Sequence, residues 1–197
     1  MKATIMPSFK SILKAAVFAA LIFPIASCAD MKTAKVAAKE GDYATALKNY
    51  EKLAEIGLPD AQLELAKLYR DGSGVAKDEK KALDLIQKSA DGGNAKALTE
   101  LGRLYADGKG VPVDGKKASA LFEQAAQKGD TRAYYYRGQL FREGEIVGQD
   151  LDLAQSLYLK ACIGGYEKAR ERLDSISMPK CPKTLVPVNK SLPVSDE

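Results

Sequence analysis

Apolar residues between positions 60 and 93 recur at the three- and four-residue spacing of two amphipathic helices. Gly72 stands where the first helix needs a left-handed residue at its C-terminus, and Asp78 is placed to cap the second helix, which Gly93 ends. Neither helix can bury its apolar stripe alone, so the pattern predicts a packed helix pair. The inward positions are Ala61, Leu65, Leu68 and Tyr69 in the first helix, and Ala82, Leu85, Ile86 and Ala90 in the second.

This pattern returns with a period of 36 residues, which brings four alanines into register: Ala61, Ala97, Ala133 and Ala169. Such a period predicts an all-α, right-handed solenoid of helix pairs, with repeats at 59–94, 95–130 and 131–166. Small residues also recur at one position of the first helices, at Ala66, Gly102 and Gly138. We expect them to lie where paired helices approach each other closely.

The segments outside these repeats differ from them and from one another. Residues 31–58 carry a shorter form of the helix-pair pattern, with a turn at Gly41-Asp42-Tyr43. Residues 167–176 predict a lone helix that caps the array, since the end of a solenoid needs a polar outer face. Residues 177–197 hold four prolines and no helical or strand period, which indicates an extended tail.

The N-terminal segment has the pattern of an export signal. Lys2, Lys10 and Lys14 precede a short apolar run over residues 15–26, which proline interrupts. This run is too short for a comfortable membrane span, so residues 1–27 are predicted to be a signal peptide.

The end of that signal, Ile25-Ala26-Ser27-Cys28, resembles the lipobox of bacterial lipoproteins. The resemblance implies that Cys28 is acylated and becomes the mature N-terminus, with the chain tethered to a membrane by lipid. Ala29 in place of an aspartate directly after the cysteine points to the periplasmic face of the outer membrane, rather than to the inner membrane. An uncleaved anchor, or a chance cysteine after a signal peptide, is the alternative.

The repeats resemble the Sel-one-like repeat family, relatives of the tetratricopeptide repeat. The segment from Leu101 to Val111 (LGRLYADGKGV) carries the closest likeness, continued by Asp114, Lys117-Ala118 and Ala125-Ala126. The third repeat departs from the pattern, because Arg137 replaces an inward leucine and Ile146 replaces a loop glycine. Its loop is therefore expected to differ. Residues 28–58 are similar to a lipidated N-terminus followed by a tetratricopeptide-like helix pair.

Composition argues against an enzyme. The chain has no histidine, the most common general base and metal ligand. Three of the 30 basic residues lie in residues 1–27, and the remaining 27 face 26 acidic residues, which is no footprint for nucleic acid. The repeated aspartates are explained as helix caps, so neither a catalytic residue, a metal site nor a cofactor is predicted.

Two cysteines remain after lipidation. Cys162 takes an inward position, and Cys181 follows it in the tail. Two thiols in an exported chain favour a disulfide that pins the tail to the last helix pair. A buried free thiol with an exposed one is the alternative.

The resemblance also implies a binding groove, because the first helices of tetratricopeptide-like pairs line an inner surface through outward positions. Their variable residues and the basic side chains among them suggest an acidic partner. An ordinary solvated face is the alternative. The predicted groove residues are Leu63, Lys67, Arg70, Thr99, Arg103, Ala106, Tyr135, Gln139 and Arg142.

The predicted function is therefore a non-catalytic scaffold that holds protein partners in the bacterial envelope, facing the periplasm. The stretch from Cys28 to Gly57 resembles the alginate-export scaffold lipoproteins of the AlgK type. That resemblance implies an alternative role in assembling a polysaccharide secretion complex, with an outer-membrane porin as partner. A regulator of peptidoglycan hydrolysis, or a weak hydrolase, is the other alternative.

Overall fold

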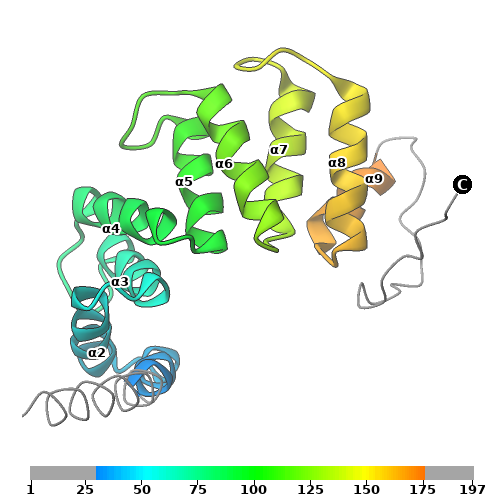
Figure 1. The fold of residues 1–197 in the computed structure, drawn as a ribbon. Helices are drawn as coiled ribbons and strands as arrows, with labels where there is room; N and C mark the ends of the chain where they lie inside the picture. Colours follow the sequence, from blue (N-terminus) through cyan, green and yellow to red (C-terminus); the bar gives the residue numbers. More distant parts are fainter. Residues whose placement is uncertain (1–29, 176–197) are drawn as a thin grey trace, which may run out of the picture. The chain divides into compact units, whose positions relative to one another are not determined.

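The computed structural model describes residues 30–175 of the chain. The predicted signal peptide 1–27, Cys28 and the tail 177–197 with Cys181 lie outside this range. Within it, all regular structure is helical and no strand occurs (Figure 1). The all-α helix-pair fold predicted from the 36-residue period is confirmed.

Two compact units divide the chain, Met1–Asp78 and Glu79–Glu197, and the boundary falls inside the predicted repeat 59–94. The N-terminal unit, described over 30–78, contains the helical residues 30–40, α2 (Tyr43–Glu55) and α3 (Pro59–Asp71). Helices α2 and α3 pack together, and Tyr50 and Leu53 of α2 are almost fully buried.

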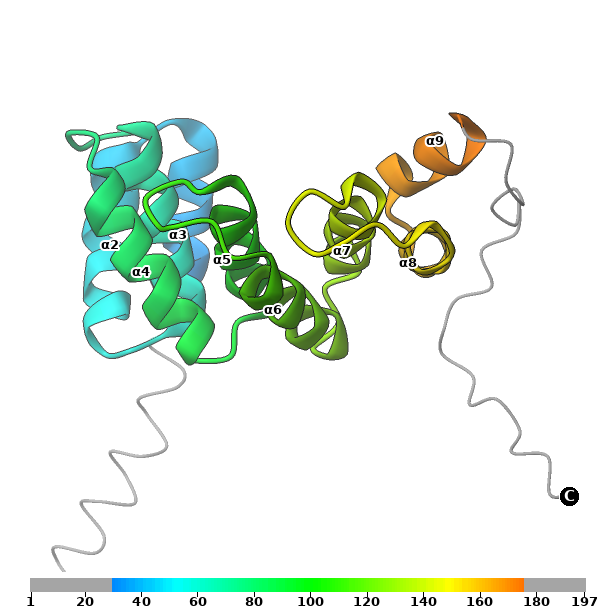
Figure 2. The same ribbon diagram turned by 90° about the horizontal axis from the view of Figure 1, so that it is seen from above.

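The C-terminal unit, described over 79–175, contains six helices: α4 (Glu79–Asp91), α5 (Ala95–Asp107), α6 (Gly115–Gln127), α7 (Arg132–Glu143), α8 (Leu151–Ile163) and α9 (Glu167–Ser175). Each packs on the next in the chain, and α5 also contacts α7. Figure 1 shows α5 to α8 standing side by side, and Figure 2 shows the helices from α5 to α9 following one another in chain order.

The same devices end and restart the helices in successive repeats. Gly72, Gly108 and Gly144 close the first helices with φ near +70°, which a glycine adopts without the strain that a Cβ would bring. Asp114 and Asp150 then cap the second helices, each accepting a hydrogen bond from the backbone N–H three residues ahead.

A glycine allows a close helix contact in the repeat 95–130. A Cβ built on Gly102 of α5 would lie 2.7 Å from Cε1 and 2.9 Å from Cδ1 of Phe122 in α6. Phe122 is 1% exposed, so its ring has no open space to move into. The small residue is therefore what lets α5 and α6 meet.

The third repeat accommodates its two departures in different ways. Arg137 donates from Nε to Ser119 Oγ at 3.1 Å and pairs with Glu123 at 3.1 Å, so residues of α6 satisfy the charge that replaced a leucine. In the loop, Ile146 is not left-handed, and Gly148 (φ +83°) is. The loop therefore does differ from those at Gly74 and Gly110, because its second left-handed glycine lies further along the chain.

Candidate interaction surface

Three predicted groove residues do not face outward. Leu63, Thr99 and Tyr135 occupy equivalent positions in successive first helices, and they are 3%, 0% and 8% exposed. The prediction that these three side chains face outward is wrong, and of the three only Tyr135 borders a hollow, which is described below. The reason is plain for α5, which contacts α4, α6 and α7 and so buries a wider arc than a single apolar stripe.

The four basic groove residues are each paired with an acid on the same helix. These ion pairs are Lys67–Glu64 at 2.8 Å, Arg70–Asp71 at 3.0 Å, Arg103–Glu100 at 3.4 Å and Arg142–Glu143 at 3.5 Å. Exposed pairs of this kind contribute little stability, so a partner can compete for them. They nevertheless leave these positions without an excess of positive charge, and an acidic partner remains an untested prediction. Ala106 and Gln139 are partly exposed.

Thr99 instead belongs to a buried polar network between two repeats. Its hydroxyl donates to Asp130 Oδ2 at 2.8 Å and to the Ala95 carbonyl at 3.2 Å. The Arg132 side chain donates two hydrogen bonds to the same carboxylate, from Nε at 2.9 Å and from a terminal guanidinium nitrogen at 2.7 Å. A buried charge held this way joins α5 to the start of α7.

Burial disfavours the charged form of Asp130, but hydrogen bonds from Arg132 and Thr99 and the attraction of the Arg132 charge outweigh it and lower the pKa. The pKa of this carboxyl is lower in the folded chain than its unfolded value of about 3.9. The carboxylate therefore stabilises the folded state fully when the pH is above about 3.9. The contribution is lost as the pH falls through the lower, folded pKa.

We therefore expect Asp130→Asn to lower the free energy of unfolding by about 1–2 kcal/mol near neutral pH, because the amide cannot accept both charged hydrogen bonds. The difference from wild type should shrink as the pH falls below about 4. Urea unfolding followed by helical circular dichroism measures both values. Asp114→Asn is the matched control, since either residue caps α6. A pH-independent difference would show that the carboxylate charge is not what matters.

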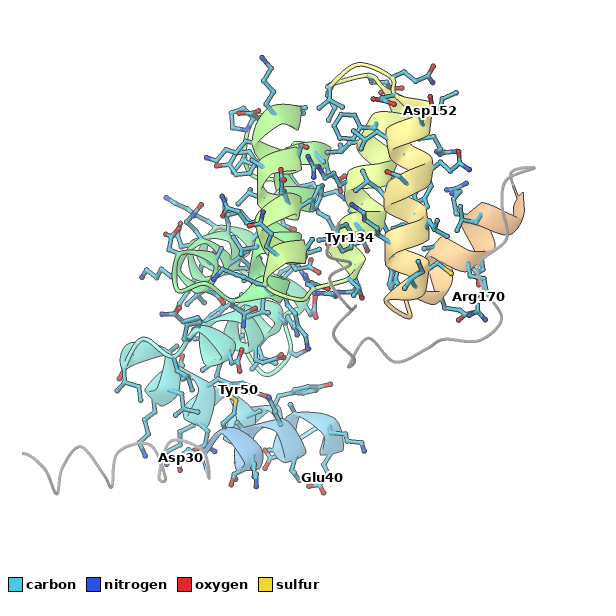
Figure 3. The ribbon with its side chains drawn as sticks, turned by 45° about the vertical axis from the view of Figure 1, so that its right-hand side comes forward. Asp30, Glu40, Tyr50, Tyr134, Asp152 and Arg170 are labelled. Atoms are coloured by element: carbon cyan, nitrogen blue, oxygen red, sulfur yellow. The ribbon has the colours of Figure 1, made fainter. Side chains whose placement is uncertain are left out.

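Next to this network lies a cluster of aromatic rings. Tyr135 touches three other tyrosines, with ring centroids 5.4 Å from Tyr136, 5.5 Å from Tyr158 and 5.2 Å from Tyr166. Tyr136 also stacks on Phe122 at 6.0 Å. Pairs at these distances stabilise beyond their buried area. The tyrosines at 134–136 therefore divide into a buried ring at Tyr135 and two partly exposed neighbours, of which Tyr134 is labelled in Figure 3.

This cluster reaches the surface through Tyr136 and Tyr166. The Arg103 guanidinium lies over the Tyr136 ring, 4.9 Å from its centroid, as a cation–π pair. Burial, and then a hydrogen bond with Tyr136, raise the pKa of Tyr166. An arginine held on a tyrosine offers a partner a pre-ordered contact.

A hollow of about 320 Å³ adjoins the cluster between α7 and α9. Its size lies at the small end of ligand pockets and suits a side chain or a chain terminus better than a large ligand. The buried Tyr135 forms its apolar wall, while α9 supplies charges of both signs. The lining residues are Tyr135, Lys168, Glu171 and Arg172.

Behind Tyr135, Tyr158 is 1% exposed, and its hydroxyl has no hydrogen-bond partner among residues 30–175. Burial raises the pKa of Tyr158, and the charges of Arg142 and Arg172 oppose that rise.

We call this surface the Tyr–Arg face; it comprises Arg103, Tyr135, Tyr136, Tyr166, Lys168, Glu171 and Arg172. Of these, the sequence predicted Arg103 and Tyr135. The α9 residues are not among the predicted ones, because the sequence pattern predicts only a capping helix there, although Ala169 places it in register with the other first helices. Extending the 36-residue period to α9 is the signal that finds them.

Cys162 is 1% exposed in α8 and is disulfide-bonded. Its predicted partner, Cys181, lies outside the described residues, so the pairing with Cys181 stays a prediction. The predicted lipid attachment at Cys28 lies outside them as well.

In the described part of the chain, no group of three or more histidine, cysteine, aspartate or glutamate side chains is arranged to hold a metal ion. None of the helices described is both long and apolar enough to cross a membrane.

The chain is similar to known Sel1 repeat proteins. The model of the Sel1 repeat matches residues 38–58, 59–94, 95–130 and 131–166. A Sel1 repeat protein from Oxalobacter formigenes is 27% identical, with a TM-score of 0.67 over 74% of this chain and 62% of that one. A protective antigen of uropathogenic Escherichia coli with an SLR fold is 30% identical, with a TM-score of 0.63 over 67% of this chain and 28% of that one.

This chain thus spans less than two thirds of the length of either structure. No curated protein matches it.

Proposed function

Because the chain belongs to the Sel1 repeat family, whose members generally mediate contacts between proteins, we propose that it holds a protein partner in the bacterial cell envelope. The partner binds on the Tyr–Arg face of the C-terminal unit. The proposed role is that of a scaffold, without catalysis.

The observation that carries this proposal is the partly exposed Arg103–Tyr136 pair beside the hollow between α7 and α9. Arginine and tyrosine are the residues most often found at the energetic centre of protein interfaces. Here both are ordered before binding, Arg103 by Glu100 and the ring, and Tyr136 by Phe122. Pre-ordered side chains lose less conformational entropy when a partner arrives.

The charges of the hollow indicate the chemistry of the partner. Lys168 and Arg172 supply two cations against one carboxylate, Glu171, around an aromatic wall. This set suits a segment that presents a carboxylate next to an apolar side chain. A peptide with a single carboxylate beside an apolar side chain fits that description. A long run of acidic residues fits less well, because Glu171 and Glu100 would repel it.

The proposed location follows from the lipobox-like sequence Ile25-Ala26-Ser27-Cys28. Acylation at Cys28 would tether the repeats to the outer membrane, facing the periplasm, since several acyl chains bury enough methylene groups to hold a protein firmly. The inner membrane is the less favoured place because Ala29, and not an aspartate, follows the cysteine.

A narrower candidate is a part in assembling a polysaccharide secretion complex around an outer-membrane porin. It rests on the resemblance of residues 28–57 to the AlgK-type scaffolds. Regulation of a peptidoglycan hydrolase is also compatible with a periplasmic scaffold. The identity of the proteins captured on the Tyr–Arg face would separate these candidates.

We expect Cys28→Ser to abolish incorporation of labelled palmitate and to move the protein out of the membrane fraction, because no other residue of the lipobox carries a thiol. Fractionation of labelled cells measures both. Ser27→Ala is the matched control, since it keeps a small residue before the cysteine and should leave both results unchanged. A Cys28→Ser protein that stays in the membrane fraction with undiminished label would refute the tether.

A further inference from the structure

We propose that one face of the helical residues 30–40 docks onto anionic phospholipid at the surface of the membrane that holds the chain. The inference deepens the proposed function and rests on acylation at Cys28. It adds a second contact with the bilayer, which would orient the N-terminal unit on the membrane rather than leave it free to swing on its tether.

The helical segment has two distinct faces. Met31, Ala34 and Ala37 on one face are buried within the N-terminal unit. The opposite face carries Lys32, Lys35, Val36 and Lys39, all exposed, at the spacing i, i+3, i+4 and i+7 that places side chains on one side of a helix. Three positive charges and an apolar residue therefore form one stripe.

The three lysines carry their charge without compensation. Within residues 30–175, no carboxylate forms an ion pair with Lys32, Lys35 or Lys39. Of the acids in the segment, Asp30 pairs with Lys52 of α2 at 3.0 Å, and Glu40 follows Lys39 directly but forms no ion pair with it. Figure 3 labels Asp30 and Glu40 at the two ends of this helical segment. A patch that pairs with nothing on its own protein is free to meet negative charge elsewhere.

The position of the stripe brings it to the membrane. Cys28 is two residues before Asp30, so Asp30 lies within about 7 Å of the acylated residue. Along the helix axis, Lys39 lies about 14 Å beyond Asp30. A helix that lies flat keeps all three lysines within the screening length of about 8 Å at physiological salt, whereas an upright helix carries Lys39 beyond it. Attraction to anionic headgroups therefore favours the flat orientation.

The tether makes a weak attraction effective. A basic residue next to an anionic bilayer shifts binding about fivefold, so three shift it about a hundredfold. The acyl chains already hold the helix near the bilayer. The factor therefore acts on the equilibrium between a docked and an undocked helix of the same tethered molecule. Val36, 54% exposed in the middle of the stripe, is placed to enter the interface with the lysines around it.

The absence of tryptophan from the sequence offers a clean probe. Val36→Trp introduces a single fluorophore in the stripe. The acylated protein, purified from membranes, is reconstituted into vesicles of phosphatidylcholine, alone or mixed with phosphatidylglycerol. We expect emission at shorter wavelength, and quenching by brominated acyl chains, in the anionic vesicles only. Raised salt should reverse both effects.

Charge reversal at Lys32, Lys35 and Lys39 should abolish the change in emission. The matched control reverses Lys80, Lys88 and Lys96, which are exposed in the C-terminal unit, and so alters the net charge by the same amount. That control should keep the response. Loss of the response in both variants would mean that net charge, and not this face, drives it, and would overturn the inference.

Equal emission in the two kinds of vesicle would also overturn it. A second outcome would overturn it as well. In that outcome a protein partner cross-links to the stripe in cells, charge reversal abolishes this cross-link, and the same reversal leaves the tryptophan emission in vesicles unchanged. Mass spectrometry of the N-terminal peptide separates the two proposals. An acylated peptide, in a protein whose introduced tryptophan stays exposed to water, refutes the docking alone. An unacylated peptide refutes the tether and the docking with it.

Discussion

Replacing Gly102 by leucine is expected to lower the midpoint of thermal unfolding of the C-terminal unit by roughly 5–20 °C. A side chain at this position meets the Phe122 ring at 2.7 Å before its second carbon is added. Overpacking of a core in this way costs about 1–3 kcal/mol or more, which in a domain of this size corresponds to that change in midpoint. The loss should appear even though leucine favours a helix more than glycine does, by a little under 1 kcal/mol.

The overpacking at Gly102 cannot be relieved by a small movement of Phe122 alone, because this ring is buried. Phe122 stacks on Tyr136, which in turn carries Arg103, so a displaced ring disturbs the Tyr–Arg face. Thermal unfolding followed by circular dichroism measures the midpoint. Ala120→Leu, at an exposed position of α6, is the control for adding a leucine to the same helix pair. An unchanged midpoint in Gly102→Leu would mean that α5 and α6 do not cross at this glycine.

The helix pairs could be predicted because their physical requirements repeat. A left-handed glycine after each first helix, a capping aspartate before each second helix and inward alanines every 36 residues all agree on one arrangement. A fold can be predicted from the sequence when local and long-range signals agree in this way. Even the departure at Ile146 was visible, since a missing loop glycine implies a different loop.

The binding surface was less predictable, because side-chain exposure in a solenoid depends on neighbouring repeats. Thr99 is polar and lies at a variable position, yet it is buried. Its hydroxyl donates a hydrogen bond to Asp130, and periodicity does not reveal that partner. Tyr135 is covered by three rings from three segments of the chain. The pairing of Arg103 with Glu100 follows helical spacing and was foreseeable.

The second large effect concerns binding. Reversing the charges of Arg103 and Lys168 should weaken capture of the partner about tenfold or more, because each reversal removes an attraction of about 0.5–1 kcal/mol and adds a repulsion of similar size. Both residues lie on the surface of first helices, α5 and α9, so folding should be little affected. Arg142 is unsuitable for this purpose, since its Nε is buried.

A matched control reverses Lys88 and Lys116, which are exposed on α4 and α6 and are not part of the Tyr–Arg face. Helical circular dichroism of both variants shows whether the fold is kept. Raised salt should weaken the wild-type complex, because exposed charges are screened. These comparisons separate a loss of the interface from a loss of structure.

The most direct measurement places a photo-reactive residue at Arg103, at Lys168, and at Gln124 on the exposed side of α6, and cross-links each protein in living cells. If the chain is a scaffold that holds its partner on the Tyr–Arg face, the same protein will be cross-linked from Arg103 and Lys168 and not from Gln124. It will also be captured about tenfold less by the double charge-reversal variant. A partner cross-linked equally from Gln124, or recovered at full yield by that variant, would contradict the account.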